Sequence, residues 1–249
     1  MKKMLLVDGN SLLFRAYYAT AYGSIMKSKD GTPTNAIFAL ANMLNKVIDN
    51  VNPDYALIAF DTDKKTFRHE EYKDYKAGRK PAPVELITQF PLAREMVSKM
   101  GIKCYELAGY EADDIVATMA RIGEENDCKV EVFSSDKDLF QLIDEKITVN
   151  IPKKGTSDIL AVTPSVLKSE YGLHPYQITD YKGIFGDTSD NIKGIKGIGE
   201  KGAIKLLEEY GSLENIYENI DKIEGKLKDK LIEGKEDGFY SKKLATICN

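Results

Sequence analysis

The sequence predicts an α/β fold with a mostly parallel sheet, followed by an all-helical C-terminal part. In the first two thirds of the chain, short apolar runs alternate with stretches whose apolar residues recur at helical spacing, which is typical of a sheet flanked by helices. After Thr163-Pro164 one short helical stretch follows another, and glycines end them. These glycines are Gly172, Gly186, Gly211 and Gly234. We therefore divide the chain into residues 1–162 and 163–249.

Three apolar runs predict strands, and each run leads into an aspartate. In an open parallel sheet the ligand site lies outside the carboxyl ends of the strands, so we expect these aspartates to converge. The runs are residues 4–7 before Asp8, residues 56–60 before Asp61, and residues 130–133, which two serines separate from Asp136.

Three stretches of the first part predict helices. Residues 34–48 carry apolar side chains at helical spacing, residues 84–100 form a second helix that Gly101 ends, and residues 111–125 form a third. At the other end of the chain, residues 239–249 predict a helix that runs into a strand without a polar tail. We therefore expect the sequence to be a fragment of a longer protein.

The composition is that of an ordinary globular protein. At 249 residues, with 43% hydrophobic and 30% charged residues, the chain can form one large domain or two small ones. No apolar run approaches the roughly 20 residues of a membrane span, and the start is too short for a signal peptide. The three widely spaced cysteines favour small buried residues over disulfides. We expect a cytoplasmic protein that does not contact a membrane.

The net charge of −4 hides two basic stretches. Residues 64–80 hold seven basic side chains against three acids, and residues 193–205 hold four lysines against one glutamate. Because the local field rather than the total charge attracts a polyanion, these stretches favour a nucleic-acid partner.

Nine acidic residues are candidate metal ligands, because so many like charges share one site only when cations hold them. A ligand set made of oxygen atoms favours Mg²⁺ or Mn²⁺, and two such ions suit phosphoryl chemistry in which a metal-activated water is the nucleophile. Helix capping by Glu111 and its neighbours, a turn at residues 136–138 and an Asx-turn at residues 187–190 remain alternatives. The nine are Asp8, Asp61, Glu111, Asp113, Asp114, Asp136, Asp138, Asp187 and Asp190.

Two further motifs suit nucleic acid. Residues 67–79 interleave aromatic side chains with cations, which suits stacking on unpaired bases; a solvated charged face is the alternative. Residues 194–203 form a glycine hairpin before a helix at 204–210, and such a turn lets backbone N–H groups approach a phosphate; a plain helix–turn–helix corner is the alternative. The hairpin is not a P-loop, because Glu200 follows Gly199.

Together these residues, in this order, resemble the 5′ nuclease family, which comprises the 5′→3′ exonuclease domain of bacterial DNA polymerase I and stand-alone flap endonucleases. The resemblance covers essentially the whole chain. The matching motifs are Leu6-Val7-Asp8-Gly9-Asn10-Ser11 with Arg15, Phe60-Asp61, Phe67-Arg68-His69-Glu70, Tyr75-Lys76-Ala77-Gly78-Arg79, Gly109-Tyr110-Glu111-Ala112-Asp113-Asp114, Ser135-Asp136-Lys137-Asp138-Leu139, Gly186-Asp187-Thr188-Ser189-Asp190-Asn191 and the glycine hairpin. Lys193-Gly194 stands where the family often has Pro-Gly, and Gly202 replaces a common threonine.

The resemblance implies a PIN-like twisted central sheet in a catalytic domain at 1–162, a helical arch at about 64–91, and a helix–three-turn–helix DNA-binding part at 163–249. It also implies two Mg²⁺ ions, for which Mn²⁺ can substitute, and a K⁺ ion in the hairpin. The implied first metal group is Asp8, Asp61, Glu111 and Asp113; the second is Asp114, Asp136, Asp138, Asp187 and Asp190; the potassium site is Gly194, Gly197 and Gly199.

The resemblance further implies roles for basic and aromatic residues. Lys76, Arg79 and Arg68 would stabilise charge on the scissile phosphate. The residues expected to contact DNA are Arg15, Tyr72, Tyr75, Lys193, Lys196, Gly197, Gly199 and Lys201.

The implied function is a structure-specific, metal-dependent 5′→3′ exonuclease and flap endonuclease. It would hydrolyse DNA and RNA-primer phosphodiesters at 5′ flaps, nicks and RNA-primed ends, leaving a 5′-phosphate and a 3′-hydroxyl, in primer removal, replication and repair. We expect a nucleoid-associated monomer, fused to a polymerase in the full-length protein. The alternatives are a PIN-type ribonuclease and a non-catalytic module that binds junctions.

Overall fold

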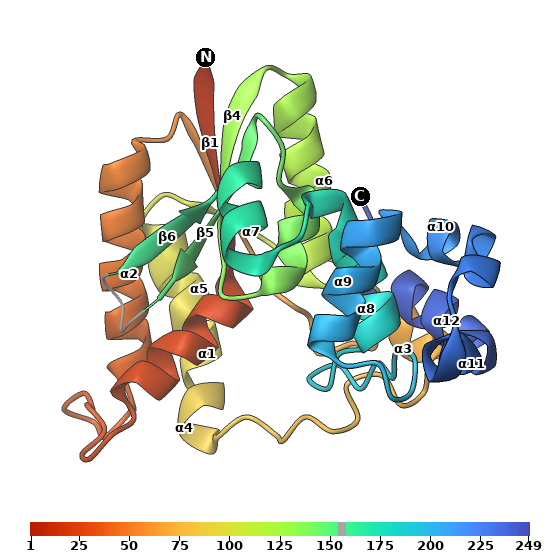
Figure 1. Cartoon of the computed structure of the whole chain (residues 1–249). Coiled ribbons are helices and arrows are strands. Elements are labelled where there is room, and N and C mark those ends of the chain that lie inside the picture. Colours follow the sequence, from red (N-terminus) through yellow and green to blue (C-terminus); the bar gives the residue numbers. More distant parts are fainter. Residues whose placement is uncertain (154–157) are drawn as a thin grey trace. The chain divides into compact units, whose positions relative to one another are not determined.

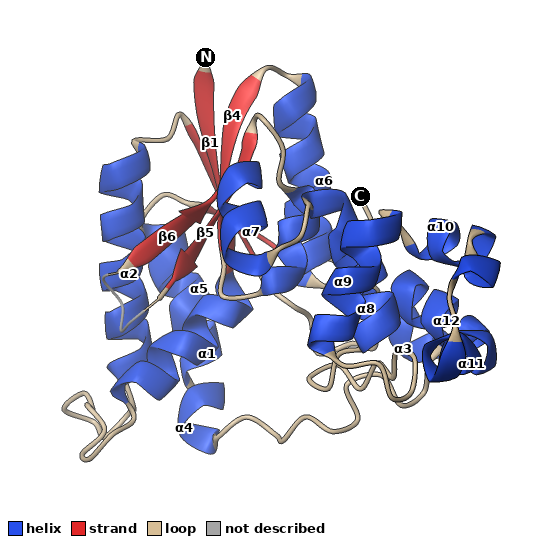
Figure 2. Cartoon of the chain, in the orientation of Figure 1, coloured by secondary structure: helices blue, strands red, loops and turns tan. Residues whose placement is uncertain are grey.

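The computed structural model describes residues 1–153 and 158–249. The chain forms two compact units: unit 1 comprises residues 1–66, 81–163 and 248–249, and unit 2 comprises residues 67–80 and 164–247. Unit 1 holds the strands, and unit 2 is built from helices and loops (Figure 1; Figure 2). The segment 67–80, inside the predicted arch, thus packs with unit 2.

Six strands form one sheet in the order β3-β2-β1-β4-β5-β6. Neighbouring strands are parallel, except that β6 is antiparallel to β5. The strand order reverses between β1 and β4, and in open α/β sheets the ligand site lies at the carboxyl ends of the strands at this switch point. The strands are β1 (Lys2–Asp8), β2 (Tyr55–Ala59), β3 (Lys103–Tyr105), β4 (Cys128–Phe133), β5 (Ile147–Pro152) and β6 (Ile159–Val162).

Helices cover both faces of the sheet, which explains why its central strands are apolar without interruption. Leu5 and Val7 belong to a core shared with α1 (Gly9–Thr20), α2 (Asn35–Val51) and α5 (Gln89–Lys99). Leu6 is also buried and points to the opposite face, because side chains alternate along a strand. That face is covered by α6 (Ala112–Glu125) (Figure 1).

The predicted helices at 34–48 and 111–125 correspond to α2 and α6, whereas the single helix predicted at 84–100 is wrong. It is broken at Thr88 into α4 (Val84–Ile87) and α5. Pro91 lacks the N–H that would bond the carbonyl four residues earlier, and proline is tolerated only in the first turn of a helix. The predicted strand at the end of the chain is also wrong, since α12 (Lys235–Ala245) is followed by irregular chain.

Unit 2 is mostly helical, as predicted. The helices of unit 2 are α3 (Phe67–Glu71), α7 (Pro164–Tyr171), η2 (Pro175–Gln177), α8 (Ile178–Phe185), α9 (Glu200–Tyr210), α10 (Leu213–Glu218), η3 (Ile220–Lys222), α11 (Gly225–Glu233) and α12; η1 (Lys137–Leu142) belongs to unit 1.

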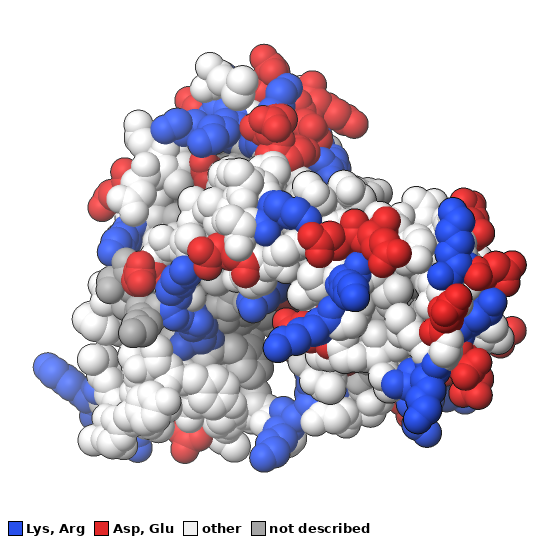
Figure 3. Space-filling model, viewed as in Figure 1, with Lys and Arg blue, Asp and Glu red and all other residues white. Residues whose placement is uncertain are grey.

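Within the described residues, no helix is long and apolar enough to cross a membrane. On the face shown in Figure 3, Lys and Arg side chains lie among Asp and Glu side chains.

Candidate active site

Asp8 lies at the switch point of the sheet, where β1 ends. It is 4% exposed and caps α1, accepting hydrogen bonds from the Ser11 N–H at 3.0 Å and the Ser134 hydroxyl at 2.8 Å. Burial, followed by the nearby charges of Asp61 and Asp136, raises the pKa of Asp8 to about 7, although the bond from Ser11 opposes them. A carboxylate in such surroundings is stabilised when a cation lies beside it.

Asp61 follows β2 and connects three elements of unit 1. Its carboxylate accepts a 2.8 Å hydrogen bond from the Asn10 amide in α1 and another of 2.8 Å from the backbone N–H of Ala112 at the start of α6. Sequence reasoning did not single out Asn10 as a partner, because the two residues are 51 positions apart.

Asp136 follows β4 and lies at the N-terminus of η1. Its carboxylate accepts the N–H of Asp138 at 2.9 Å, and its own N–H donates to Ser134 at 2.9 Å. The turn expected as the alternative at this motif is therefore present. It leaves Asp136 half-buried and close enough for its charge to act on Asp8.

Glu111 and Asp114 form a capping box at the start of α6, which was the structural alternative for this motif. The Glu111 N–H donates to Asp114 at 3.0 Å, and the second oxygen of Asp114 accepts the N–H of Cys248 at 2.9 Å. Asp114 is 2% exposed, whereas Asp113 is half-buried in the same turn. Both oxygens of Asp114 thus bond backbone N–H groups.

Three of the seven candidate acids of unit 1, Asp8, Asp61 and Asp136, lie at or just after the ends of β1, β2 and β4, and the charges of Asp61 and Asp136 act on Asp8. Across residues 1–153 and 158–249, no three His, Cys, Asp or Glu side chains are close enough to hold a metal ion. Carboxylates repel each other in the absence of a cation, and here their oxygens bond N–H and hydroxyl groups instead.

In unit 2, Asp187 is paired with a lysine that sequence reasoning missed. The Lys182 ammonium lies 2.5 Å from its carboxylate, and both side chains are largely buried. Burial by itself raises the pKa of Asp187, but Lys182 and the hydrogen bonds from Ser189 outweigh it and lower the pKa to about 2. In the sequence, the only sign of this pair is that Lys182 is a charged residue among apolar residues of a helix.

Asp190 lies against the segment 67–80. Its carboxylate pairs with Arg79 at 2.5 Å and accepts the Tyr75 hydroxyl at 3.1 Å, and its carbonyl accepts the N–H of Lys76 at 3.0 Å. Lys76 has a left-handed backbone with φ 58°, and its ammonium lies 4.9 Å from the centre of the Tyr75 ring. Candidate metal-binding and phosphate-binding residues therefore meet in unit 2.

Arg68 and Tyr75 are buried, although we expected Arg68 to stabilise charge on the scissile phosphate and Tyr75 to contact DNA. Arg68 is 3% exposed and donates to the carbonyls of Leu244 and Thr246 at the end of α12. Tyr75 is 4% exposed and packs in a small apolar cluster with Leu244, against which the half-buried Tyr72 also packs. In this arrangement all three hold the segment 67–80 in unit 2.

The glycine hairpin connects α8 to α9. Gly194 and Gly197 have positive φ values of 63° and 82°, and a Cβ on Gly194 would lie 2.3 Å from the backbone nitrogen of Gly186. Gly199 is the N-cap of α9 with an ordinary φ of −87°, and nothing lies within 4 Å of where its Cβ would be. The Gly197 carbonyl accepts a 2.7 Å bond from the Lys230 ammonium.

The remaining candidate DNA contacts differ in exposure. Lys193, Lys196 and Lys201 are exposed around the hairpin. Arg15 is half-buried in unit 1, where one of its NH₂ groups donates to the Lys153 carbonyl at 2.8 Å. The three lysines are thus accessible to a phosphate, whereas Arg15 already holds a backbone carbonyl.

Two family descriptions together match nearly the whole chain. Residues 3–172 match the 5′-3′ exonuclease, N-terminal resolvase-like domain, and residues 173–249 match the 5′-3′ exonuclease, C-terminal SAM fold. Among curated relatives, DNA polymerase I of Bacillus subtilis (strain 168) is 48% identical over 99% of this chain. DNA polymerase I of Streptococcus pneumoniae (strain ATCC BAA-255 / R6) is 49% identical over 99% of this chain. The chain spans 28% of the length of each relative.

Solved structures show the same fold at lower identity. T5 5′-exonuclease, in a structure with bound divalent metal ions (zinc), superposes with a TM-score of 0.79 and 21% identity over 98% of this chain and 89% of the other. The catalytic core of Rad2 in complex with DNA superposes with a TM-score of 0.57 and 17% identity over 98% and 76%. The predicted α/β fold with its helical C-terminal part is confirmed, and the chain belongs to the 5′-3′ exonuclease family.

Proposed function

We propose that this chain is a metal-dependent 5′→3′ exonuclease and flap endonuclease. It would hydrolyse DNA and RNA-primer phosphodiesters at 5′ flaps, nicks and RNA-primed ends, leaving a 5′-phosphate and a 3′-hydroxyl. The observation that carries the proposal is the placement of Asp8, Asp61 and Asp136 at the switch point of the sheet, in a chain that the family matches over residues 3–249.

Divalent cations fit the acids of this site. The pKa of Asp8 is raised to about 7 by burial and by two neighbouring carboxylates, which is the electrostatic cost that a cation would remove. The donors are carboxylate oxygens, which favour Mg²⁺ or Mn²⁺, and the T5 5′-exonuclease structure holds divalent metal ions. The proposed ligands are Asp8, Asp61, Glu111 and Asp113 for one ion, and Asp114, Asp136, Asp138, Asp187 and Asp190 for the other.

Within these two sets, the geometry separates residues that could contact an ion directly from residues that hold other ligands in place. Asp114 uses both oxygens on backbone N–H groups, so we assign it the role of holding Glu111 and the start of α6 in place. Lys182 balances the charge of Asp187 and would keep that carboxylate ionised. When bound, the metal ions would lower the pKa of an attacking water and neutralise charge on the phosphate.

Lys76 and Arg79 are the proposed phosphate-stabilising residues. Both belong to a segment anchored on Asp190, through the Lys76 N–H and the Arg79 guanidinium. Their charges would contribute most where negative charge develops during the reaction. Arg68 is not part of this proposal as a catalytic residue, because its guanidinium is buried on the carbonyls at the end of α12.

The glycine hairpin would bind the duplex. Gly197 and Gly199 are exposed, as are Lys193, Lys196 and Lys201, and the N-terminus of a helix favours a phosphate. Such contacts hold the backbone without reading bases. The Rad2 core in complex with DNA supports DNA as the partner of this fold. Tyr72 and Arg15 would contact DNA only after local rearrangement.

The proposal includes a K⁺ ion in the hairpin, bound by the carbonyls of Gly194, Gly197 and Gly199. Because the Lys230 ammonium already contacts the Gly197 carbonyl, K⁺ would have to displace that contact or use the other two carbonyls.

We further propose that the chain is the nuclease part of a longer DNA polymerase I, since its relatives bear that name. It would act as a monomer on nucleoid DNA in the cytoplasm.

A labelled 5′-flap duplex tests the proposal. Cutting at the junction should require Mg²⁺ or Mn²⁺ and stop in excess chelator. Cutting that persists in chelator would overturn the metal mechanism. Equal cutting of single-stranded RNA without a junction would favour the PIN-type ribonuclease, and flap binding without cutting would favour the non-catalytic module.

A further inference from the structure

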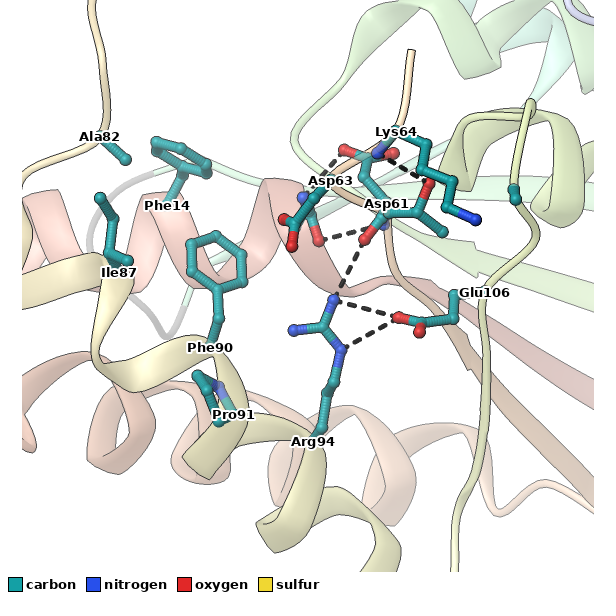
Figure 4. Close-up of a pocket in the computed structure, with 13 residues that line it drawn as sticks. Phe14, Asp61, Asp63, Lys64, Ala82, Ile87, Phe90, Pro91, Arg94 and Glu106 are labelled. Carbon is teal, nitrogen blue, oxygen red and sulfur yellow. Dashed lines mark hydrogen bonds and ion pairs between the residues drawn. The ribbon is translucent and has the colours of Figure 1, made fainter. Parts of the chain in front are cut away.

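Two cavities of unit 1 differ in character. One, of about 830 Å³, borders Asp61 and belongs to the nuclease site proposed above (Figure 4). There the Arg94 guanidinium donates to the Asp61 carbonyl at 3.0 Å and to Glu106 at 3.2 Å. The other, of about 620 Å³, lies between α6, β3 and the last two residues of the chain. We call this second cavity the α6–β3 groove.

The α6–β3 groove exposes large apolar side chains. Tyr105, Leu107, Tyr110 and Ile122 all line it, and each is between 39% and 45% exposed. Single exposed apolar side chains are ordinary, but several that gather in one hollow are typical of a surface that another polypeptide covers.

The groove lies where one face of the sheet is open at β3. Lys103 and Tyr105 line the groove, whereas Cys104 between them packs against the core that includes Val97 of α5. Side chains alternate along a strand, so these two sets belong to opposite faces. Mostly parallel sheets are buried on both faces, and β3 is also an edge strand, which proteins commonly cover. The α6 face of β3 is therefore where the fold has room for a further element.

α6 carries a second apolar stripe beside the one that packs on the sheet. Val116 and Ala120 are fully buried, in a helix that packs on β1, β2 and β4. Ile115, Met119 and Ile122 recur at helical spacing and line the groove instead. A helix with one partner typically has one apolar stripe, so the second stripe indicates a second partner.

The end of the chain forms part of the groove wall. Cys248 and Asn249 belong to unit 1 and line the groove, and the Cys248 N–H donates to the Asp114 carboxylate at 2.9 Å. The chain spans 28% of the length of its polymerase relatives, so the longer protein proposed above has many further residues, and we take Asn249 as the point where they begin. At about 3.3–3.6 Å per extended residue, a few of them suffice to cover the groove.

We propose that the α6–β3 groove receives the segment that follows Asn249 in the longer protein, with apolar side chains packed against Tyr105 and Ile122. This inference rests on the proposal that the chain is the nuclease part of a longer DNA polymerase I, and it concerns attachment rather than cutting. The docked segment covers the open face of β3 and fixes the start of the following domain beside α6. Burial of apolar surface drives the docking.

The thiol of Cys248 is the reporter, because it is exposed and lines the groove. Its rate of labelling by a maleimide is measured in the 249-residue chain, in the chain extended by its own next residues (roughly 20, enough to cross the groove several times) and in the full-length protein. Peptide mass spectrometry separates it from Cys104, the internal control on the opposite face of β3.

Two variants place a charge in the groove, and one does not. Ile122→Asp and Leu107→Asp act at different points of the lining, so that one remains informative if the other fails to fold. Ile232→Asp is the matched control, because Ile232 lies on α11, is 55% exposed and does not line the groove. These variants are decisive, since added residues could slow labelling merely by lying near Cys248.

In both longer forms, Cys248 should be labelled about tenfold or more slowly than in the 249-residue chain, because a thiol under a docked segment reacts only when that segment opens. Labelling of Cys104 should not change. Ile122→Asp and Leu107→Asp should restore fast labelling of Cys248, and Ile232→Asp should not.

Equal rates in all three forms, or slow labelling that survives both groove variants, would overturn the inference. Slow labelling only in the full-length protein would assign the groove to another domain, and a rate in the 249-residue chain that falls with protein concentration would assign it to a second copy; either result contradicts the proposed occupant. Flap cutting is measured on the same preparations. Cutting without protection of Cys248 refutes only this inference, whereas protection without cutting supports it and refutes the proposed nuclease.

Discussion

Arg79 and Asp190, which are 111 positions apart in the chain, form an ion pair with a nitrogen–oxygen distance of 2.5 Å. Asp190 also accepts the Tyr75 hydroxyl and, through its carbonyl, the Lys76 N–H. One proposed metal ligand therefore positions the segment that carries both proposed phosphate-stabilising cations. A cation that takes over the Asp190 carboxylate would leave the Arg79 guanidinium available to a phosphate.

Arg79→Ala should slow single-turnover cutting of a flap at least tenfold and lower stability only modestly. The Arg79 side chain is 49% exposed, but that of Asp190 is 9% exposed and would keep only the Tyr75 hydroxyl of these two donors, so the loss should be about 1–3 kcal/mol. Urea unfolding and single-turnover kinetics on the same preparation separate the two effects. A stability loss of several kcal/mol with unchanged cutting would assign Arg79 a structural role instead.

Lys76→Ala should lower the single-turnover rate far more than the affinity for the flap, because its charge is worth most in the transition state. At φ 58° the backbone of alanine is strained about as much as that of lysine, so the turn should persist. The exposed Lys65 is the control: Lys65→Ala should mainly weaken binding and its salt dependence. If both variants lose affinity and rate in parallel at two salt concentrations, Lys76 acts only by attracting DNA.

Two glycines of the hairpin should respond differently to alanine. Gly194→Ala should lower the unfolding temperature, because its φ is 63° and the new Cβ would lie 2.3 Å from the Gly186 nitrogen. Gly199→Ala should leave stability within about 1 kcal/mol, a typical N-cap cost, and weaken binding to duplex arms of different sequence equally. Thermal unfolding and affinities in chelator test both. Wild-type duplex affinity in Gly199→Ala would mean that no phosphate approaches this residue closely.

Lys242→Met should destabilise unit 2 more at pH 7 than at pH 5. Asp180 is 2% exposed and lies 2.6 Å from the Lys242 ammonium. Burial raises the pKa of Asp180, and Lys242 opposes this rise, so removing Lys242 should raise that pKa further. A carboxyl whose folded pKa exceeds its unfolded value loses stabilisation as pH rises through the folded pKa.

At pH 7 the buried Asp180 charge would therefore lack its partner, at a cost of about 3 kcal/mol. Urea unfolding at the two pH values measures the difference. The control is Lys243→Met, since Lys243 pairs with Glu71 and its side chain is 67% exposed; it should change stability little at either pH. Equal losses for Lys242→Met at both pH values would contradict the assignment.

The strands that could be predicted were those with uninterrupted apolar runs, namely β1, β2 and β4. β5 was missed because Thr148 and Asn150 break its apolar pattern, although every residue of the strand is buried; the Asn150 amide is satisfied by Glu131 at 2.8 Å. β3 has only three residues. α1 was missed because Asp8 both ends a strand and caps a helix, which leaves no loop between them.

The positions of the acids at strand ends could be predicted because strand direction determines where a side chain after the strand lies. The partners that orient the acids could not, since Asn10, Ser134 and Lys182 show no local pattern and act through the tertiary fold. The burial of Arg68 could not be predicted either, because its hydrogen-bond partners are carbonyls 176 and 178 positions away.

Asp136→Asn tests the central claim most directly, by comparing single-turnover cutting of a 5′ flap in Mg²⁺ with flap affinity in chelator. The amide preserves the size of the side chain and the oxygen that accepts the Asp138 N–H, so the turn should remain. The account predicts that cutting slows by orders of magnitude while affinity is unchanged or higher, because negative charge facing DNA is removed. Normal cutting by the folded variant, or loss of DNA binding without a selective loss of cutting, would contradict a metal-dependent nuclease site at the switch point of this sheet.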